Sequence, residues 1–428
     1  EYTRTSTAVT NAYLSPTLKS YVSAINEYFT NLGGENNVRY FQSNGGLATG
    51  DVMIDRSVYA INSGPASAPI AGLSIAKSFN YQNVITVDMG GTSFDITLTK
   101  EGSTNLNKNI DFLRYRIGVP MIQVETLGAG GGSIGCIDQM GLLQVGPHSA
   151  GANPGPACYG LGGLSATVTD ADLILGYLDA SNFLGGDMKL DVEASKSAVK
   201  NTIADPLGLT VVDAAWAIHE TVNESMAQAA AIHALEKAKR ITDYTMIPIG
   251  GAGPVHACNI ALKLNLSKLI CPPGAGVASA LGFLVSPTSF TTLQGGVVPL
   301  NQLNFKTLNH QILYMEEQGR KLITDAMEKK DEVSVEILAS MRYIGQGYNV
   351  EVEIPKSVLS SQNISEIQQL FEVVYLTQFG RIESHMAIEI VSWRVVTSGP
   401  TPTIDLAKAR VGVQSDNYKK GERQVYFG

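Results

Sequence analysis

The residues best suited to chemistry lie in a short turn that follows an apolar segment. Residues 84–87 are rich in Val and Ile and lack the polar interruptions of an exposed strand, so they predict a buried strand ending at Asp88. The turn contains two glycines and two hydroxyl side chains, namely Gly90, Gly91, Thr92 and Ser93. Glycine lets the backbone turn tightly and brings peptide N–H groups close to an anion. This turn is therefore a candidate phosphate-binding loop.

Two carboxylates flank the turn, Asp88 before it and Asp95 after it. Carboxylate oxygens are hard ligands that suit Mg²⁺ or its bound water. Asp88 is accordingly a candidate metal ligand, whereas Asp95 either joins the same site or makes a structural hydrogen bond that orients the turn. The plain alternative for the whole segment is a β-hairpin with a Gly-Gly turn, which is a common structure with no ligand.

A second turn of the same kind lies far along the chain. The apolar residues 246–249 predict another buried strand, and a helix is expected to begin near Pro254, because proline is favoured at a first helical position. The glycines between them are Gly250, Gly251 and Gly253. They allow the backbone to lie flat against a ligand such as an adenosine, although close packing of strand on helix also explains them. Two such turns together favour one shared nucleotide cleft.

Two further segments rich in glycine lie between these turns. Residues 128–135 hold several glycines around Ser133, and this pattern predicts a second anion site formed by Gly130, Gly131 and Ser133. Residues 145–163 contain too much Gly and Pro for a helix or a central strand, so they predict a long functional loop. Thr169 or Asp170 is expected to cap a helix after it.

Three side chains in these segments admit both a chemical and a structural interpretation. His148 either contacts a substrate or orders its loop through a hydrogen bond. Cys158 suggests a nucleophile, but the sequence places no His or Asp near it. His256 lies in the first turn of the predicted helix, where a packing role is expected.

Composition excludes several classes of function. The chain has 428 residues, of which 44% are hydrophobic and 16% charged, and it includes 43 glycines, which fits an α/β enzyme of two or three domains. The net charge of −8 argues against nucleic-acid and anionic-membrane partners. No apolar run is as long as a membrane span. The four cysteines show no metal-binding spacing, which favours a reduced, cytoplasmic setting.

The chain divides into three parts by pattern. Residues 1–80 predict a helix at 6–32, a strand at 38–42 and a second helix after Ser63. Residues 81–290 carry the glycine turns and a long Ala-rich helix at 212–240. Residues 291–428 predict helices at 308–329 and 364–379 and strands at 333–343, 349–354 and 387–396, which is an α+β module. The final residues 425–428 begin another strand-like pattern.

Five segments in this order resemble the hydantoinase A/5-oxoprolinase family, which includes the nucleotide-binding subunits of acetone and acetophenone carboxylases. The segments are Asp88-Met-Gly-Gly-Thr-Ser-Phe-Asp95, Gly128-Ala-Gly-Gly-Gly-Ser-Ile134, Val145-Gly-Pro-His-Ser-Ala-Gly-Ala-Asn-Pro-Gly-Pro-Ala-Cys-Tyr159, Thr167-Val-Thr-Asp-Ala171 and Gly250-Gly-Ala-Gly-Pro-Val-His256. The resemblance covers nearly the whole chain.

The resemblance implies an actin/sugar-kinase/Hsp70-like (ribonuclease H-like) ATPase core, an α/β fold, with a C-terminal α+β module. By resemblance, residues 88–95 are its second phosphate motif and residues 250–256 its adenosine motif, with Asp88 and Asp95 catalytic and with ATP and Mg²⁺ as cofactors. Family members begin with a lobe that carries its own Asp-x-Gly-Gly-Thr turn. No such turn is found in residues 1–80, which are therefore expected to be the end of that lobe in a longer protein.

The activity implied by the resemblance is ATP-dependent phosphorylation of a cyclic amide carbonyl for ring-opening hydrolysis. The expected partners are a small cyclic amide and a second, hydantoinase B-like subunit in an oligomer. Two alternatives remain open: the nucleotide-binding subunit of a ketone carboxylase, and a nucleotide-responsive module without chemistry of its own.

Overall fold

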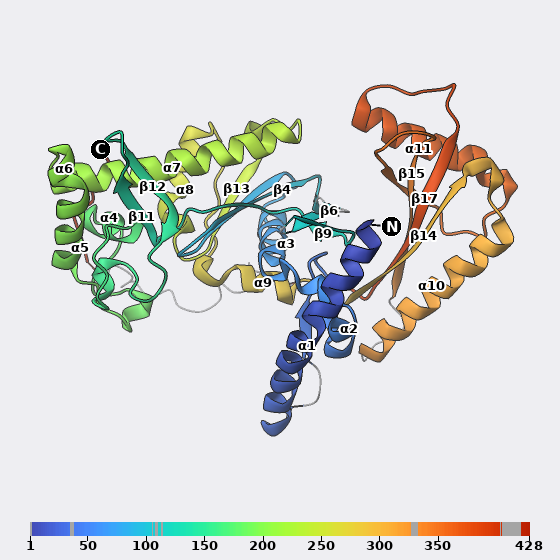
Figure 1. The fold of residues 1–428 in the computed structure, drawn as a ribbon, viewed down its shortest axis with the longest axis horizontal. Coiled ribbons are helices and arrows are strands. Elements are labelled where there is room, and N and C mark those ends of the chain that lie inside the picture. The colour runs from blue at the N-terminus through green and yellow to red at the C-terminus, as the bar shows by residue number, and fades with distance from the viewer. Residues whose placement is uncertain are drawn as a thin grey trace.

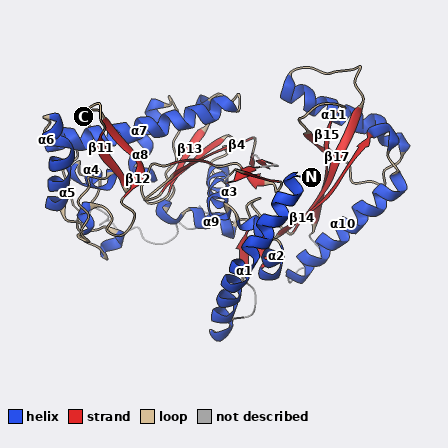
Figure 2. Ribbon diagram, in the orientation of Figure 1, coloured by secondary structure: helices blue, strands red, loops and turns tan. Residues whose placement is uncertain are grey.

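The computed structural model describes residues 2–34, 38–104, 106–107, 110–112, 114–326, 333–402, 404 and 421–428. Figure 1 shows a central sheet with helices on both faces, a mainly helical part at one end and a separate sheet with two long helices at the other. The same view coloured by secondary structure separates these three regions clearly (Figure 2).

The central sheet has the strand order β10-β4-β3-β13, and β5 pairs with β4. Its strands are β3 (Val84–Met89), β4 (Phe94–Lys100), β5 (Ser103–Thr104), β10 (Glu125–Leu127) and β13 (Thr245–Ile249). β4 runs antiparallel to β3, whereas β13 runs parallel to it. Each of the two predicted glycine turns therefore follows the C-terminal end of its strand, β3 or β13, and both turns lie at the same end of the sheet.

Strand β3 is buried on both faces because its alternate side chains enter different cores. Ile85 and Val87 belong to a core with the long helix α7 (Val211–Glu236) and with α8 (Gly253–Lys263). Val84 belongs instead to a core with α3 (Ser63–Lys77). This burial explains why the strand reads as a continuous apolar run and not as an alternating one.

The predicted long loop is partly a strand. A two-stranded antiparallel sheet pairs β11 (Ser133–Ile137) with β12 (Leu143–Ser149), so residues 145–149 lie in a hairpin. One cis peptide bond lies within β12, before Pro147, and a second lies in the loop that follows, before Pro154. The helices α4 (Val168–Ile174), α5 (Val192–Val199) and α6 (Asp205–Leu207) complete this region.

Asp170 organises the start of α4. Thr167 is the N-cap residue and forms a capping box with Asp170. The expected caps, Thr169 and Asp170, therefore lie two and three positions too far along the chain. The buried Asp170 carboxylate also accepts hydrogen bonds from the peptide N–H groups of Ala157 and Cys158, at 3.1 and 2.8 Å, and from Ser195 Oγ at 2.6 Å. One carboxylate thus ties the Gly/Pro-rich loop to α4 and α5.

The N-terminal region is built around one long helix. α1 (Tyr2–Asn31) confirms the helix expected at residues 6–32, and β1 (Arg39–Phe41) confirms the short strand. β1 pairs with β2 (Leu47–Thr49), and α2 (Gly50–Asp55) follows. Short hairpin pieces lie between this region and the central sheet, namely β6 (Leu106–Asn107), β7 (Ile110–Phe112), β8 (Tyr115–Ile117) and β9 (Met121–Ile122).

The C-terminal region is a four-stranded sheet in the order β14-β17-β15-β16. It contains β14 (Ser289–Pro299), α10 (Phe305–Ala326), β15 (Ser334–Tyr343), β16 (Val350–Ile354), α11 (Ile364–Phe379) and β17 (Ile388–Ser398). The sequence pattern predicts all of these except β14. That strand escapes prediction because its middle is exposed and its register shifts between Gly295 and Val298, which removes the alternating pattern.

The last residues return to the helical region. Residues 421–428 cross beside α4 and α7, where Tyr426 N donates to Leu175 O at 2.9 Å and Tyr177 Oη donates to Tyr426 O at 2.9 Å. The strand expected at 425–428 is not formed, because these residues bond to a helix end and not to a sheet. α9 (Ser279–Leu284) connects the central sheet to β14. Within the described ranges, no helix combines the length and the apolarity needed to cross a membrane.

The Asp170 contacts predict a strong effect on stability. Asp170→Asn should lower the free energy of unfolding by about 3 kcal/mol, because an amide nitrogen replaces an acceptor that faces N–H and O–H donors. Urea unfolding followed by Trp216 fluorescence in a Trp393→Phe background would measure this, since those are the two tryptophans. Asp179→Asn, at an exposed carboxylate, is the control and should change stability by less than about 0.5 kcal/mol. Equal losses in the two variants would contradict the assignment.

Candidate functional site

Asp88 and Asp95 face each other across paired strands. The register of β3 and β4 places Asp88 directly opposite Asp95 and Met89 opposite Phe94. Thr126 on β10 lies beside Asp95 and donates a hydrogen bond from Oγ1 to its Oδ1 at 2.6 Å. Three neighbouring strands therefore fix both carboxylates at the end of the sheet that leads into the glycine turns.

Both carboxylates are harder to ionise than a free aspartate, chiefly because they are buried. Burial, and secondly the charge of Asp95, raise the pKa of Asp88 from 3.8 to about 6. Burial also raises the pKa of Asp95, although the Thr126 hydrogen bond opposes this shift. Among the described residues, neither carboxylate forms an ion pair with a protein cation, and such an acidic pair is a place where a bound metal ion or its waters would be favourable.

The turn beyond Asp88 is open to solvent on the side away from the sheet. Gly90 N donates to Ser93 O at 3.1 Å, which closes the turn, while Gly91 and Thr92 are exposed. A methyl group added at Gly90 or Gly91 would meet no atom within 4 Å. The four turn residues predicted as phosphate contacts thus border free space, which is what such a contact requires.

The segment around Gly130 supports this turn from behind. Gly131 N and Gly132 N donate to Gly90 O and Gly91 O at 3.0 and 2.6 Å. A Cβ at Gly130 would lie 2.6 Å from Thr92 N, so only glycine fits there. Gly130 N itself donates to the buried Ser133 Oγ at 2.9 Å.

These bonds give Gly130, Gly131 and Ser133 a different role from the one predicted. Their N–H groups already have acceptors, since Ser133 N donates to Gly130 O at 3.0 Å. The structure therefore places the three residues as a support of the Asp88 turn, and a direct anion contact by them stays a prediction. The segment is in turn held by α4, because Thr169 N and Oγ1 both donate to Gly131 O, at 2.7 and 2.8 Å.

The second glycine turn lies against the first. Gly250 has φ +83°, and a Cβ there would come within 2.4 Å of Asp88 Oδ1. Gly250 N donates to Ala275 O at 2.9 Å and Ala252 N donates to Met89 O at 3.0 Å. Gly251 is exposed with open space beside it, and Gly253 begins α8. The fold thus brings Asp88, Asp95 and both glycine turns to one place.

The residues present fit a hard divalent cation and an anion. Asp88 and Asp95 supply only oxygen donors, and burial raises the pKa of both, so a bound cation would favour their charged forms. The exposed backbone of Gly91 and Thr92 lies beside them. The arrangement is suited to holding a phosphate and its metal ion and positioning them for transfer.

The other candidate side chains have mixed outcomes. His148 is exposed on β12. Cys158 is fully buried, and burial together with the neighbouring Asp170 strongly raises the pKa of its thiol, so it is not a nucleophile. His256 is fully buried, as a packing role requires, but it also belongs to a polar cluster with Asp172 and His219 that sequence reasoning missed. Its members come from three helices, so no local spacing reveals it.

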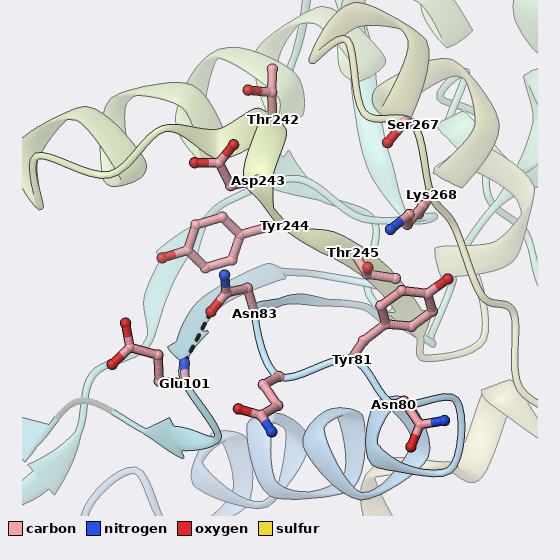
Figure 3. Close-up of a pocket in the computed structure, with 11 residues that line it drawn as sticks. Asn80, Tyr81, Asn83, Glu101, Thr242, Asp243, Tyr244, Thr245, Ser267 and Lys268 are labelled. Atoms are coloured by element: carbon pink, nitrogen blue, oxygen red, sulfur yellow. Dashed lines mark hydrogen bonds between the residues drawn. The ribbon is translucent and has the colours of Figure 1, made fainter.

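Other cavities lie away from this site. A cavity of about 470 Å³ is lined by residues from Asn80 to Asn83 and from Thr242 to Thr245, at the opposite edge of the central sheet (Figure 3). A larger groove of about 950 Å³ lies between α1 and the C-terminal sheet, with Arg56 and Arg394 among its lining residues. Neither contains Asp88 or a glycine turn.

Comparison with known proteins decides the family. The model of the hydantoinase/oxoprolinase family matches residues 4–291, and that of the hydantoinase/oxoprolinase C-terminal domain matches residues 303–428. The chain belongs to the hydantoinase/oxoprolinase family. Family membership was predicted from the five sequence segments and is confirmed.

Relatives in this family differ in the reaction that their names describe. The chain is 45% identical over 395 residues to the caprolactamase subunit alpha of Pseudomonas jessenii, covering 92% of the chain and 57% of the relative. It is 30% identical over 392 residues to the acetophenone carboxylase gamma subunit of Aromatoleum aromaticum, covering 89% and 53%. The chain therefore spans less than two thirds of the length of these relatives.

Solved structures agree with the family. The ATP-dependent caprolactamase from Pseudomonas jessenii matches with a TM-score of 0.78 and 43% identity, over 95% of this chain and 60% of that one. Nucleotide-free acetone carboxylase matches with a TM-score of 0.79 and 25% identity, over 94% and 58%. These matches and the observed topology confirm the predicted α/β core with a C-terminal α+β module, and the likeness of that core to actin, sugar kinases and Hsp70 stays a prediction.

The strained carboxylate pair predicts that removing one charge stabilises the protein. In a chelator and without nucleotide, Asp88→Asn should raise the free energy of unfolding at pH 7 by about 1 to 2 kcal/mol, a value discounted for partial exposure. The raised pKa means that the folded state binds the Asp88 proton more tightly, so wild-type stability falls as pH rises from 3.8 to about 6.

The pH dependence supplies the check. The advantage of Asp88→Asn should be absent below the ordinary carboxyl pKa of 3.8, grow up to about 6 and stay constant above it. Thermal or urea unfolding at a series of pH values would measure it, with the exposed Asp187→Asn as control. A variant less stable than wild type at pH 7 would refute the electrostatic account.

Gly130 is enclosed by backbone and Gly90 borders open space, so replacement by alanine should destabilise the protein at Gly130 and have little effect at Gly90. Gly130→Ala should lower the free energy of unfolding by about 1–3 kcal/mol, because its Cβ would overlap the backbone of Gly91 and Thr92. Gly90→Ala should change it by less than about 0.5 kcal/mol, since its Cβ meets open space. Unfolding followed by Trp216 fluorescence would compare the two. Equal effects would show that both glycines serve the same purpose.

Proposed function

We propose that this chain is part of an enzyme that uses ATP to phosphorylate the carbonyl oxygen of a cyclic amide, which is then hydrolysed with ring opening. The observation that supports it most is the convergence of Asp88, Asp95 and two glycine turns at one edge of the sheet. The similarity to a caprolactamase subunit, at 45% identity, favours a lactam over other carbonyl compounds.

The residues divide the work as follows. Asp88 holds Mg²⁺ or its waters, and Asp95, fixed by Thr126, stands opposite as the second carboxylate. Mg²⁺, when bound, neutralises phosphate charge during transfer. The backbone and hydroxyl groups of the turn contact the phosphates, namely Gly90, Gly91, Thr92 and Ser93. Gly250, Gly251 and Gly253 lie against the adenosine, with the N-terminus of α8 behind them.

The reaction needs ATP because an amide is a poor electrophile. The amide oxygen attacks the γ-phosphorus of ATP and ADP leaves, which places a phosphate on the former carbonyl oxygen. Water then adds to the carbon, the ring C–N bond breaks with the amine as leaving group, and a second water releases phosphate from the acyl phosphate. The first step needs positioning and charge stabilisation more than a protein nucleophile. That requirement agrees with a site in which Cys158 is buried and unreactive.

The hydrolytic steps call for a second, hydantoinase B-like subunit in this proposal. Several relatives are named as subunits of larger enzymes, among them the alpha subunit of caprolactamase and the gamma subunit of acetophenone carboxylase. The described chain offers glycine turns and carboxylates for a phosphoryl transfer. The complete natural protein and its partner are therefore the material to assay.

A ketone carboxylase subunit is the second candidate. The acetophenone carboxylase relative and the acetone carboxylase structure support it, at 30% and 25% identity. The same phosphorylation would then act on the enol oxygen of a ketone before carboxylation. A nucleotide-responsive module without chemistry is less favoured, because the supporting Gly130 segment and the Asp170-bound loop add much backbone beside the turn.

Turnover measurements separate these functions. ADP release by the complete protein with its partner should increase at least tenfold with a lactam, 5-oxoproline or hydantoin, and ring-opened product should form in proportion. Stimulation by acetone or acetophenone together with bicarbonate would select the carboxylase. No stimulation by any of these carbonyl compounds would leave the module as the only candidate.

The residue assignment has its own prediction. Asp88→Ala should lower substrate-dependent ADP release by at least about 100-fold while the protein stays folded, because a phosphoryl-transfer site loses its metal-binding carboxylate. Gly90→Ala should weaken binding of a non-hydrolysable ATP analogue, measured by calorimetry, since its methyl group fills the open space. Asp187→Asn is the matched surface control. Wild-type turnover in Asp88→Ala would remove Asp88 from the mechanism.

A further inference from the structure

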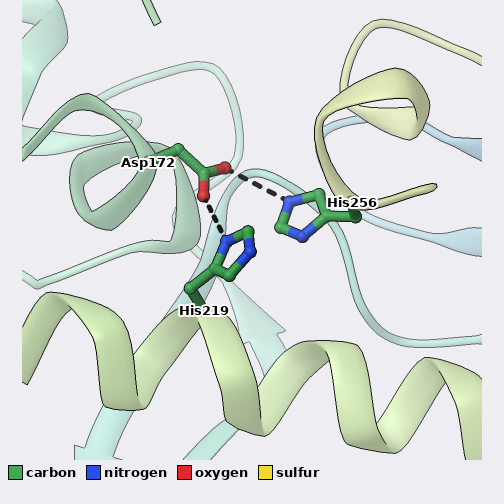
Figure 4. A group of neighbouring side chains, drawn as sticks. All are labelled: Asp172, His219 and His256. Atoms are coloured by element: carbon green, nitrogen blue, oxygen red, sulfur yellow. Dashed lines mark hydrogen bonds and ion pairs between the residues drawn. The ribbon is translucent and has the colours of Figure 1, made fainter. Parts of the chain in front are cut away.

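A buried polar cluster lies between three helices, apart from the carboxylate pair. Asp172 comes from α4, His219 from α7 and His256 from the first turn of α8, and the three side chains point toward one another (Figure 4). His219 Nδ1 lies 2.7 Å from Asp172 Oδ1, and His256 Nε2 lies 3.2 Å from Asp172 Oδ2. His219 and His256 are 0% exposed and Asp172 3%, so bulk solvent does not reach their charges.

The hydrogen bonds around His256 favour a positive species beside it. Its Nδ1 lies 2.8 Å from Asn223 Oδ1, and with the amide in this orientation the oxygen accepts and Nδ1 carries the proton. In a neutral imidazole the opposite nitrogen, Nε2, then presents a lone pair to the Asp172 carboxylate. Nε2 faces this carboxylate at 3.2 Å and has no better-aligned hydrogen-bond partner within the described residues. Two facing acceptors in a dry core repel each other unless a cation lies between them.

The donor set is that of a transition-metal site. One oxygen of Asp172, Nδ1 of His219 and Nε2 of His256 all lie within 4.8 Å of one another. Two imidazoles and a carboxylate suit Zn²⁺ and similar ions, which prefer nitrogen ligands more than Mg²⁺ does. Metal-binding histidines commonly donate the other ring N–H to an oxygen, and His256 does so to Asn223.

Rotating the Asn259 amide lets His219 donate its outer ring N–H to an oxygen, as His256 does to Asn223. Its Nε2 lies 3.0 Å from Asn259 Nδ2. Turning the Asn259 amide by 180° exchanges its nitrogen and oxygen, which are nearly equal in shape, so that Nε2–H donates to Asn259 Oδ1. In that tautomer Nδ1 offers a lone pair to the cluster, as metal binding requires.

We propose that Asp172, His219 and His256 bind one divalent transition-metal ion of the Zn²⁺ class. The ion joins α4, α7 and α8. A cavity of about 320 Å³ lies next to the cluster, because one of its lining residues, Asn259, is the residue whose amide contacts His219.

An ion bound in this cluster would also fix the relative positions of the two glycine turns. The first turn of α4 holds Gly131 through Thr169, and Gly131 holds the Asp88 turn. α8 begins directly at the second glycine turn. An ion that fixes α4 to α8 therefore fixes the two turns relative to each other. This site is independent of the proposed reaction, because its ligands and its readout do not involve ATP.

Metal content of the protein itself is the first test. Protein purified without a polyhistidine tag, in an Asp88→Asn background that removes the carboxylate pair as a second source, should hold about one equivalent of zinc by mass spectrometry. Replacement by Co²⁺ should give visible absorption of a nitrogen- and oxygen-ligated ion. Removal by a chelator should lower the thermal midpoint, and Zn²⁺ but not Mg²⁺ should restore it.

Variants locate the ion. His219→Gln and His256→Gln should lose the stoichiometric zinc, whereas His233→Gln, at another buried histidine of α7 outside the cluster, should retain it. Asn223→Ala should bind Zn²⁺ about 10–100-fold more weakly, since it removes the oxygen that orients His256.

Two results would overturn the proposal. If the folded parent protein contains no zinc, gives no Co²⁺ spectrum and shows no change in thermal midpoint, a proton occupies the position between His256 and Asp172 instead. If His219→Gln and His256→Gln keep a full equivalent of zinc, the ion lies elsewhere. Because the parent protein is measured directly, failure of a variant to fold leaves the first result decisive.

Discussion

The antiparallel pairing of β3 with β4 is the interaction on which the site depends. It sets Asp88 opposite Asp95, and the hydrogen bonds of the strands keep both carboxylates together although burial and mutual repulsion raise the pKa of Asp88 to about 6. The fold tolerates this cost because the strands are buried on both faces and because Gly131 and Gly132 bond to the turn from behind. Stored electrostatic strain of this kind is typical of a site shaped for a ligand and not for stability.

Helix α4 connects the parts of the structure that surround this pair. Its N-terminal residues hold Gly131, its Asp170 holds the loop at Ala157 and Cys158, and its Asp172 meets two histidines from α7 and α8. The seven-residue helix thus contacts the Gly131 segment beside the first turn and the helix that begins at the second. A movement of α4 would therefore displace both glycine turns together, which couples the positions of the two turns.

The sequence predicted the strongly periodic elements well and the irregular ones poorly. α11 was expected at 364–379 and forms at those residues, because its apolar positions follow a helical period and Gly380 ends it. β14 was missed because its exposed middle and shifted register give no alternation. In the site, the Asp88 turn could be predicted as a local motif. The supporting role of Gly130 and Gly131 could not, since it depends on a contact with turn residues about 40 positions away.

The sequence by itself determined the family, the two glycine turns and the identity of the carboxylates, because those features are local and their order is specific. Tertiary structure alone decided that the turns converge, that Gly250 approaches Asp88 and that Cys158 is fully buried. It also assembled Asp172, His219 and His256 from three helices separated by up to 84 positions, the difference between 256 and 172. Spacing in sequence carries no information about such a cluster, because the packing of helices on a sheet, and not any local period, brings its side chains together.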